Sequence, residues 1–236
     1  MLIKRFSRCL LALTLVVTSV VNPATSFAFT RVQQTATTQS QTTDLTARLA
    51  ALEKELEAKR QELGVTGLSL VIVKDDKVVF MKGIGYRNLK SKLPVTPDTL
   101  FAIGSSSKAF TAMSAMMSVD DGKLSLDDSP KKYLPYFKLQ DPEADEKITV
   151  RDLMCHSSGL NRTDLPWVSG VFTREEVIKI AGQAKPTAKF REKFQYQNIM
   201  YTAAGEVVAK VQNQPWETVI KNRIFKPLGM NSSNLT

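Results

Sequence analysis

The stretch GLSLVIVKDDKVVFMKGIGY, residues 67–86, constrains the fold of this chain most strongly. Its apolar and β-branched residues on both sides of Asp75 and Asp76 predict a hairpin of two strands buried on both faces. A lone hairpin is only marginally stable in water, so these strands need a larger sheet or a packed layer. Almost no strand signal follows them. We therefore expect a mixed α/β (α+β) fold, with one antiparallel sheet and a mostly helical remainder.

Apolar residues at helical spacing predict the helices. Leucines 45, 49, 52, 56 and 63, between Asp44 and Gly64, indicate an amphipathic helix. The segment from Ser105 to Asp121 is apolar nearly all round, which favours a helix in the centre of the protein. Further helices are expected over residues 150–155, 173–181, 199–212 and 216–225.

The first 28 residues have the pattern of an export signal. Lys4, Arg5 and Arg8 precede an apolar run over residues 9–21, and Ser26-Phe27-Ala28 offers a cleavage site. We expect a signal peptide over 1–28 and a periplasmic or extracellular protein; an uncleaved membrane anchor is the alternative. Residues 29–44 are rich in Thr and Gln and are expected to form a disordered spacer. The domain would then span 45–236.

Charge and composition exclude several classes of function. The net charge of +9 becomes +6 without the leader, which suits peripheral association with anionic envelope polymers or lipid headgroups. The basic residues are scattered, so no nucleic acid partner is expected. Cys155 is alone once the leader is removed, so no internal disulfide is expected. A single histidine, His156, excludes zinc sites built on two imidazoles, and neither a metal nor a cofactor is expected.

Two Ser-x-x-Lys pairs are present, Ser105 with Lys108 and Ser129 with Lys132. Ser129 follows two aspartates and precedes a proline, which is typical of a turn or a helix cap. Ser105 lies at the start of the apolar helix, where residues three apart share a face. Burial and the helix dipole would favour an uncharged amine at Lys108, which could activate the hydroxyl. The alternative is that Ser105 caps the helix and Lys108 extends into solvent.

Four segments resemble, in order, sequence blocks of the serine β-lactamase and penicillin-binding protein superfamily. The likeness is to its class C β-lactamase, D-alanyl-D-alanine carboxypeptidase and esterase branch. The segments are FAIGSSSKAFTAM, ITVRDLMCHSSGL, FQYQNIMYTAAGEVVAKV and IFKPLGMNSS, and the resemblance covers roughly residues 60–236. It implies a β-lactamase/transpeptidase-like fold, with a helical subdomain and an antiparallel sheet.

The resemblance also implies roles for four residues. Ser105 would be the acylated nucleophile, and Lys108 its proton partner. Tyr196 would be the general acid or base, and Asn198 would bind the substrate amide and steady the lysine. Side chains two positions apart in an extended segment point the same way, as a shared site requires.

Two other arrangements are less favoured. Tyr86 with Asn88 repeats the Tyr-x-Asn spacing, but it precedes the serine and directly follows the hairpin. Cys155 and His156 are adjacent and project in different directions, which disfavours a catalytic dyad. The resemblance instead implies that the segment around His156 is structural and supports the active-site loop.

The chain also departs from the family pattern. Its third element, Lys-Thr-Gly or His-x-Gly on a C-terminal strand, is not found after Gly229. That strand would pair in the sheet and would supply one of the two backbone N–H donors of the oxyanion hole. We therefore expect a C-terminally truncated domain with impaired activity, and a complementing C-terminal polypeptide is an open partner.

The expected function is acyl transfer by an exported serine hydrolase. Its substrate could be a D-Ala-D-Ala peptide, a β-lactam, a D-amino acid amide or an ester. A non-catalytic peptidoglycan-binding or regulatory remnant of the same family is the alternative. An α/β-hydrolase is disfavoured, because such an enzyme needs a Gly-x-Ser-x-Gly turn and its base would depend on the lone His156.

Overall fold

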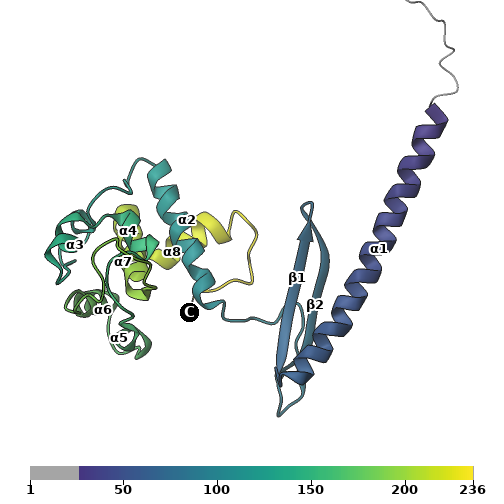
Figure 1. The fold of residues 1–236 in the computed structure, drawn as a ribbon, viewed down its shortest axis with the longest axis horizontal. Helices are drawn as coiled ribbons and strands as arrows, with labels where there is room; N and C mark the ends of the chain where they lie inside the picture. The colour runs from purple at the N-terminus through teal and green to yellow at the C-terminus, as the bar shows by residue number, and fades with distance from the viewer. Residues whose placement is uncertain (1–26, 236) are drawn as a thin grey trace, which may run out of the picture. The chain divides into compact units, whose positions relative to one another are not determined.

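The computed structural model describes the backbone of residues 27–235 and the side chains from residue 44 onward. The chain divides into two compact units at Thr99 and Leu100, which are taken separately below. Figure 1 labels their helices and strands. The predicted leader lies outside the described residues except for its last two positions.

The first unit begins with a long helix, α1 (Phe27–Glu62). This helix starts well before position 45, and its backbone includes the Thr/Gln-rich segment that the sequence led us to expect as a disordered spacer. The difference has a local cause: no glycine or proline occurs between Phe27 and Glu62. Thr and Gln cost a helix well under 1 kcal/mol each relative to alanine, so nothing in this segment interrupts the helical backbone.

The predicted hairpin is confirmed. Strands β1 (Gly67–Lys74) and β2 (Lys77–Asn88) pair antiparallel, and the two-residue β3 (Leu93–Pro94) extends the sheet in the order β1-β2-β3. Asp75 and Asp76 both have positive φ, 51° and 58°, as a two-residue hairpin turn with the twist of the strands requires.

One face of this hairpin lies against α1. Lys82 of β2 is opposite Leu70 in the register, and its amine forms an ion pair with Glu53 of α1 at 3.2 Å. Directly opposite residues in an antiparallel pair share a face, so Leu70 also faces the helix. Arg60 of α1 donates to the Val65 carbonyl oxygen at 2.8 Å, which fastens the helix end to the start of β1.

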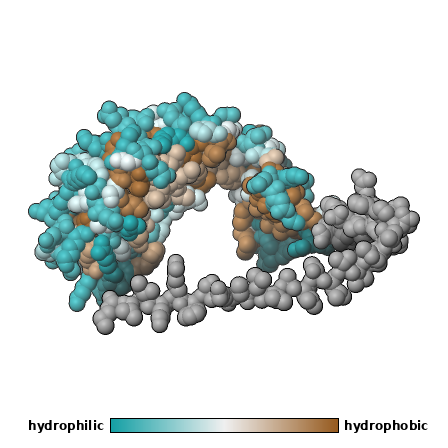
Figure 2. Space-filling view, turned by 90° about the horizontal axis from the view of Figure 1, so that it is seen from above, coloured by the Kyte–Doolittle hydropathy of each residue, from teal (hydrophilic) through white to brown (hydrophobic). Residues whose placement is uncertain are grey.

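The described elements of this unit leave the other face of the hairpin uncovered, so α1 does not bury both faces as predicted. Val71, Val73, Val78 and Met81 are each more than half exposed. Alternate residues of a strand point to opposite faces, and within this unit α1 covers only the face that carries Leu70. Apolar surface is visible on both units in Figure 2.

The second unit is helical, and the predicted helices are confirmed to within a few residues. A 3-10 turn over Gly104–Ser106 leads into α2, and a π-helical turn over Lys221–Phe225 follows α8. The helices are α2 (Ser107–Asp120), α3 (Pro142–Lys147), α4 (Val150–Cys155), α5 (Asp164–Val168), α6 (Arg174–Gly182), α7 (Asn198–Gln212) and α8 (Trp216–Ile220). None of the helices within residues 27–235 combines the length and apolarity needed to cross a bilayer.

The central helix of this unit is α7, not α2 as the sequence suggested. It packs against α2, α4, α6 and α8 (Figure 1). Its fully buried residues include Ile199, Met200, Ala203, Ala204, Val207 and Val208. By contrast, α2 packs on α7 with one face and leaves Met113 and Met116 almost half exposed on another. An apolar helix can lie at a surface because periodicity does not show how many neighbours it has.

Local hydrogen bonds fix where α4 and α6 begin. Thr149 accepts from the Asp152 N–H, and the Asp152 carboxylate accepts from the Thr149 N–H, which closes a capping box on α4. Thr173 and Glu176 do the same for α6. These Thr-x-x-acid patterns satisfy backbone donors that a helix start otherwise leaves open.

An ion pair between a buried carboxylate and a half-exposed arginine joins α4 to the segment that leads into α7. Arg191 donates to both carboxylate oxygens of Asp152, at 2.9 and 2.7 Å, and the Asp152 side chain is only 7% exposed. Burial acts to raise the pKa of Asp152, but hydrogen bonds from Arg191 and Thr149 outweigh it and lower the pKa. Asp152 therefore holds the chain just before Tyr196 in place.

We expect Asp152→Asn to destabilise the protein by about 2 kcal/mol at neutral pH, because hydrogen bonds to a charged group are lost in a buried place. The folded-state pKa is lowered, so the stabilisation is present above about pH 4 and is lost as the pH falls below that value. Urea unfolding of wild type and variant across acid pH measures both effects.

Asp127→Asn is the matched control, because Asp127 also pairs with an arginine, Arg151, but both side chains are more than half exposed. Its cost should be at most about 1 kcal/mol. Equal costs for the two variants would contradict the structural role of Asp152.

Candidate active site

Ser105 lies on the 3-10 turn just before α2, and Lys108 lies in the first turn of that helix. The Lys108 amine donates to the Ser105 Oγ at 3.2 Å. Gly104 has φ +51°, a left-handed conformation that glycine adopts without strain. The local backbone thus presents the serine hydroxyl and the amine to each other.

Tyr196 completes the contact from the other side. Its hydroxyl donates to Ser105 Oγ at 2.5 Å, across 91 positions of sequence. Lys108 Nζ lies 4.7 Å from the centre of the Tyr196 ring. One hydroxyl therefore meets both an amine and a phenol, the pair of groups that could exchange its proton.

Asn198, the first residue of α7, joins the same group. Its Oδ1 accepts from Lys108 Nζ at 2.6 Å, and its Nδ2 donates to Asp164 Oδ1 at 3.0 Å. The structure thus brings together all four residues that the sequence proposed: Ser105, Lys108, Tyr196 and Asn198.

The surroundings of this group differ from the buried site expected around Lys108. Ser105 is exposed, and so is Ala109 one turn along the helix. Lys108 is partly buried, with its amine near the faces of two aromatic rings, Tyr196 at 4.7 Å and Tyr201 at 5.4 Å. The difference follows from α2 being a surface helix of its unit. Ring faces and the Asn198 oxygen, more than apolar burial, define the setting of the amine.

The phenol of Tyr196 is tuned by its neighbours. Interaction with Lys108, then the hydrogen bond with Ser105 and the positive charges of Lys108 and Arg162, lowers the pKa of Tyr196 below its usual value near 10. A lowered pKa makes the phenolate more accessible near neutral pH, which is what a general base requires.

His156 supports Tyr196 without touching Ser105 in any described contact. The two rings stack at 4.5 Å, and His156 Nδ1 accepts from the Gln197 N–H at 3.0 Å. Burial, and to a lesser degree the charge of Lys108, lowers the pKa of His156 and favours the neutral ring. His156 also ends α4 in a left-handed conformation. Its contacts are those of a structural residue.

Sequence reasoning missed Gln197, which has no exposed surface. Its side chain accepts from the Ile199 N–H at 2.9 Å and donates to the Asn161 carbonyl oxygen at 2.8 Å. It thereby caps α7 and ties it to the loop before α5. The signal in the sequence was its place between Tyr196 and Asn198. Side chains alternate along an extended segment, so the Gln197 side chain points away from the site and into the protein.

The disfavoured motifs have other environments. The Ser129 hydroxyl accepts from the Lys131 N–H at the start of a short 3-10 turn, and Lys132 donates to Asp128 at 3.0 Å. Tyr86 and Asn88 lie on β2 in the first unit, where the Asn88 side chain accepts from the Ser91 N–H. Among the described side chains, Ser129 and Lys132 therefore do not form the contact seen between Ser105 and Lys108, and Tyr86 and Asn88 do not join a serine–lysine pair.

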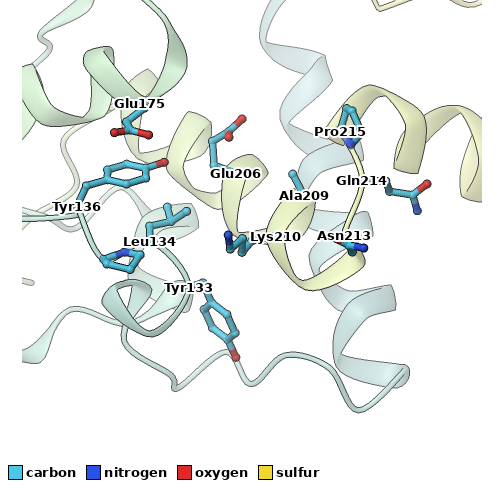
Figure 3. Close-up of a pocket in the computed structure, with 11 residues that line it drawn as sticks. Tyr133, Leu134, Tyr136, Glu175, Glu206, Ala209, Lys210, Asn213, Gln214 and Pro215 are labelled. Atoms are coloured by element: carbon cyan, nitrogen blue, oxygen red, sulfur yellow. The ribbon is translucent and has the colours of Figure 1, made fainter.

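A groove of about 580 Å³ lies elsewhere in the second unit, between the 133–136 segment, α6 and α7 (Figure 3). Tyr136 points toward Glu175 and Glu206 in this view. Burial, with the charges of Glu206 and Glu175, raises the pKa of Tyr136 to about 12. The groove contains none of the four candidate residues, so the serine site is separate from it.

Comparison with known proteins supports one family. Over 187 residues the chain is 29% identical to Protein flp of Staphylococcus aureus strain N315, covering 78% of this chain and 37% of that protein. It resembles the octameric penicillin-binding protein homologue of Pyrococcus abyssi, with a TM-score of 0.70, 38% identity, and coverage of 78% and 43%. It also resembles the D-amino acid amidase of Ochrobactrum anthropi SV3, with a TM-score of 0.67, 28% identity, and coverage of 78% and 51%.

The chain therefore spans about a third to a half of the length of these proteins. The expectation from the four sequence segments is confirmed, because the Beta-lactamase family model matches residues 49–236. The mixed fold, with helices and a small antiparallel sheet, agrees with these structures. The chain belongs to the β-lactamase family.

Proposed function

We propose that this protein is a serine hydrolase that transfers an acyl group through an ester formed on Ser105. One observation carries the proposal: Ser105 Oγ accepts hydrogen bonds from both Tyr196, at 2.5 Å, and Lys108, at 3.2 Å. A hydroxyl held by two groups that can take up or return its proton is the requirement for an activated serine.

The geometry supports a simple order of events. Tyr196, as the phenolate, takes the proton of Ser105 while Oγ attacks a carbonyl carbon. Collapse of the tetrahedral intermediate breaks the bond to the leaving nitrogen or oxygen, which receives that proton from Tyr196. Lys108 holds Ser105 Oγ by a hydrogen bond and lies over the ring of Tyr196. Lys108 is itself held by Asn198. Water then attacks the acyl ester, and its proton returns to Ser105 through the same phenol.

The substrate class remains broad in this proposal: an amide, a β-lactam or an ester with an accessible carbonyl. The names of the relatives include a D-amino acid amidase and a penicillin-binding protein homologue, which supports acyl compounds of this kind. We also propose that the protein is exported and acts in the periplasm or outside the cell. The sequence pattern of residues 1–28 supports export.

Covalent labelling tests the nucleophile. We expect a fluorophosphonate or a fluorescent penicillin to add one adduct to the purified chain, located on Ser105 by intact and peptide mass. Ser105→Ala should abolish the adduct, because the attacking oxygen is removed.

The chain offers a matched control in its second Ser-x-x-Lys pair. Ser129→Ala should be labelled like the wild type, because the Ser129 hydroxyl caps a turn. The absence of any adduct on the wild type, or an adduct that persists in Ser105→Ala, would count against the enzyme and favour the non-catalytic remnant.

The pH dependence of labelling tests the phenol. The rate should rise with pH as Tyr196 loses its proton, and the midpoint should lie below pH 10, because its pKa is lowered by Lys108 and Ser105. Tyr196→Phe should remove this rise. A wild-type rate that does not change with pH would argue against a phenolate base.

A further inference from the structure

We propose that Asp164 and Arg162 are positioning residues of the serine site: Asp164 fixes the direction of the Asn198 amide, and Arg162 holds Asp164 while its guanidinium lies against the face of Tyr196. The expected effect of these residues on the reaction rate rests on the proposed function. Their arrangement around Asn198 and Tyr196 rests on contacts alone.

A continuous set of contacts connects these residues to Lys108. Lys108 donates to Asn198 Oδ1 at 2.6 Å, and Asn198 Nδ2 donates to Asp164 Oδ1 at 3.0 Å. Arg162 donates from Nε to Asp164 Oδ2 at 2.7 Å, and its Nη2 lies 2.6 Å from the same oxygen. The Asp164 side chain is 19% exposed, so solvent does not readily replace these contacts.

The direction of the Asn198 amide is fixed from both sides. An asparagine side chain donates through Nδ2 and accepts through Oδ1. Asp164 only accepts, so it binds Nδ2, and the Lys108 ammonium only donates, so it binds Oδ1. With Asp164 removed, Lys108 alone would orient the amide, and the contact that holds Nδ2 would be lost.

Arg162 acts on the phenol from the same loop. Its guanidinium carbon lies 5.7 Å from the centre of the Tyr196 ring. The ion pair with Asp164 limits where this long side chain can go, and a positive charge near the ring stabilises the phenolate. The titratable and charged groups around Tyr196 are Lys108 on α2, His156 after α4, Arg162 in the loop before α5, Asp164 at the start of α5, and Tyr201 on α7.

Residues of the loop before α5 contact every member of the Tyr196-Gln197-Asn198 segment. Arg162 lies over Tyr196, and Asp164 accepts from Asn198. Gln197, between them, donates to the Asn161 carbonyl oxygen at 2.8 Å and to a hydroxyl of the same loop, that of Thr163, at 3.2 Å. All three members of the segment therefore contact residues 161–164, so a chance approach of one side chain does not explain the arrangement.

The first test is the titration of Tyr196 in the full chain, followed by phenolate absorbance as the difference between each protein and its Tyr196→Phe counterpart. Arg162→Gln should raise the midpoint by about half a pH unit, the effect of losing one charge at this distance. Arg162→Lys should largely restore it. Arg151→Gln, at another exposed arginine paired with an aspartate, is the control and should change nothing. An unchanged midpoint in Arg162→Gln would overturn the role of Arg162.

The second test addresses Asp164 through the rate at which a fluorophosphonate labels Ser105. Asp164→Asn replaces the charged acceptor of Asn198 Nδ2 with a neutral amide that can donate as well as accept, so this side of the Asn198 amide is no longer fixed. The rate should fall roughly tenfold, as for the loss of one charged hydrogen bond. Asp127→Asn is the matched control and should label normally. A normal rate in Asp164→Asn would overturn the role of Asp164.

Heteronuclear NMR separates this inference from the proposed function. The Asn198 side-chain amide, assigned by its loss in Asn198→Asp, should exchange slowly with solvent in the wild type and rapidly in Asp164→Ala. If the wild type is never labelled, the serine hydrolase proposal fails, while the amide exchange and the phenol titration still decide the positioning roles. Equal exchange in both proteins would overturn the arrangement.

Discussion

The serine site depends on one fully buried amide, that of Gln197. A buried amide is tolerated only when its donors and acceptor are paired, and here the side chain pairs with the first turn of α7 and with the loop before α5. Its backbone N–H donates to His156 at 3.0 Å. Because Gln197 is fixed in three directions, its neighbours Tyr196 and Asn198 have little freedom to move away from Ser105.

The site is supported by charge as much as by packing. Lys108 and Arg162 bring positive charge close to the ring of Tyr196, and both lower the pKa of its phenol. Arg191 and the buried carboxylate of Asp152 hold the chain a few residues earlier through an ion pair. Together these pairs convert a partly exposed tyrosine into a group with a defined position and an altered acidity, which an isolated helix start could not provide.

Each unit has an apolar face that its own described elements leave uncovered. The hairpin presents Val71, Val73, Val78 and Met81, and α2 presents Met113 and Met116. The sequence correctly identified both segments as apolar, but it predicted more burial than the elements of each unit provide. Composition sets how much apolar surface a segment carries, whereas burial depends on which neighbours reach it. The same reason explains why α7, not α2, is the central helix of its unit.

The sequence by itself determined local features: the hairpin turn at Asp75 and Asp76, the starts of α4, α6 and α8, and the spacing of Ser105 and Lys108. These depend on residues a few positions apart, where propensity and capping act. Only the tertiary structure decided that Tyr196 meets a serine 91 positions away. It also decided that Arg162 lies over the Tyr196 ring and that Asp164 accepts from Asn198. Such contacts arise when separate helices pack, and no local pattern records which side chains then face one another.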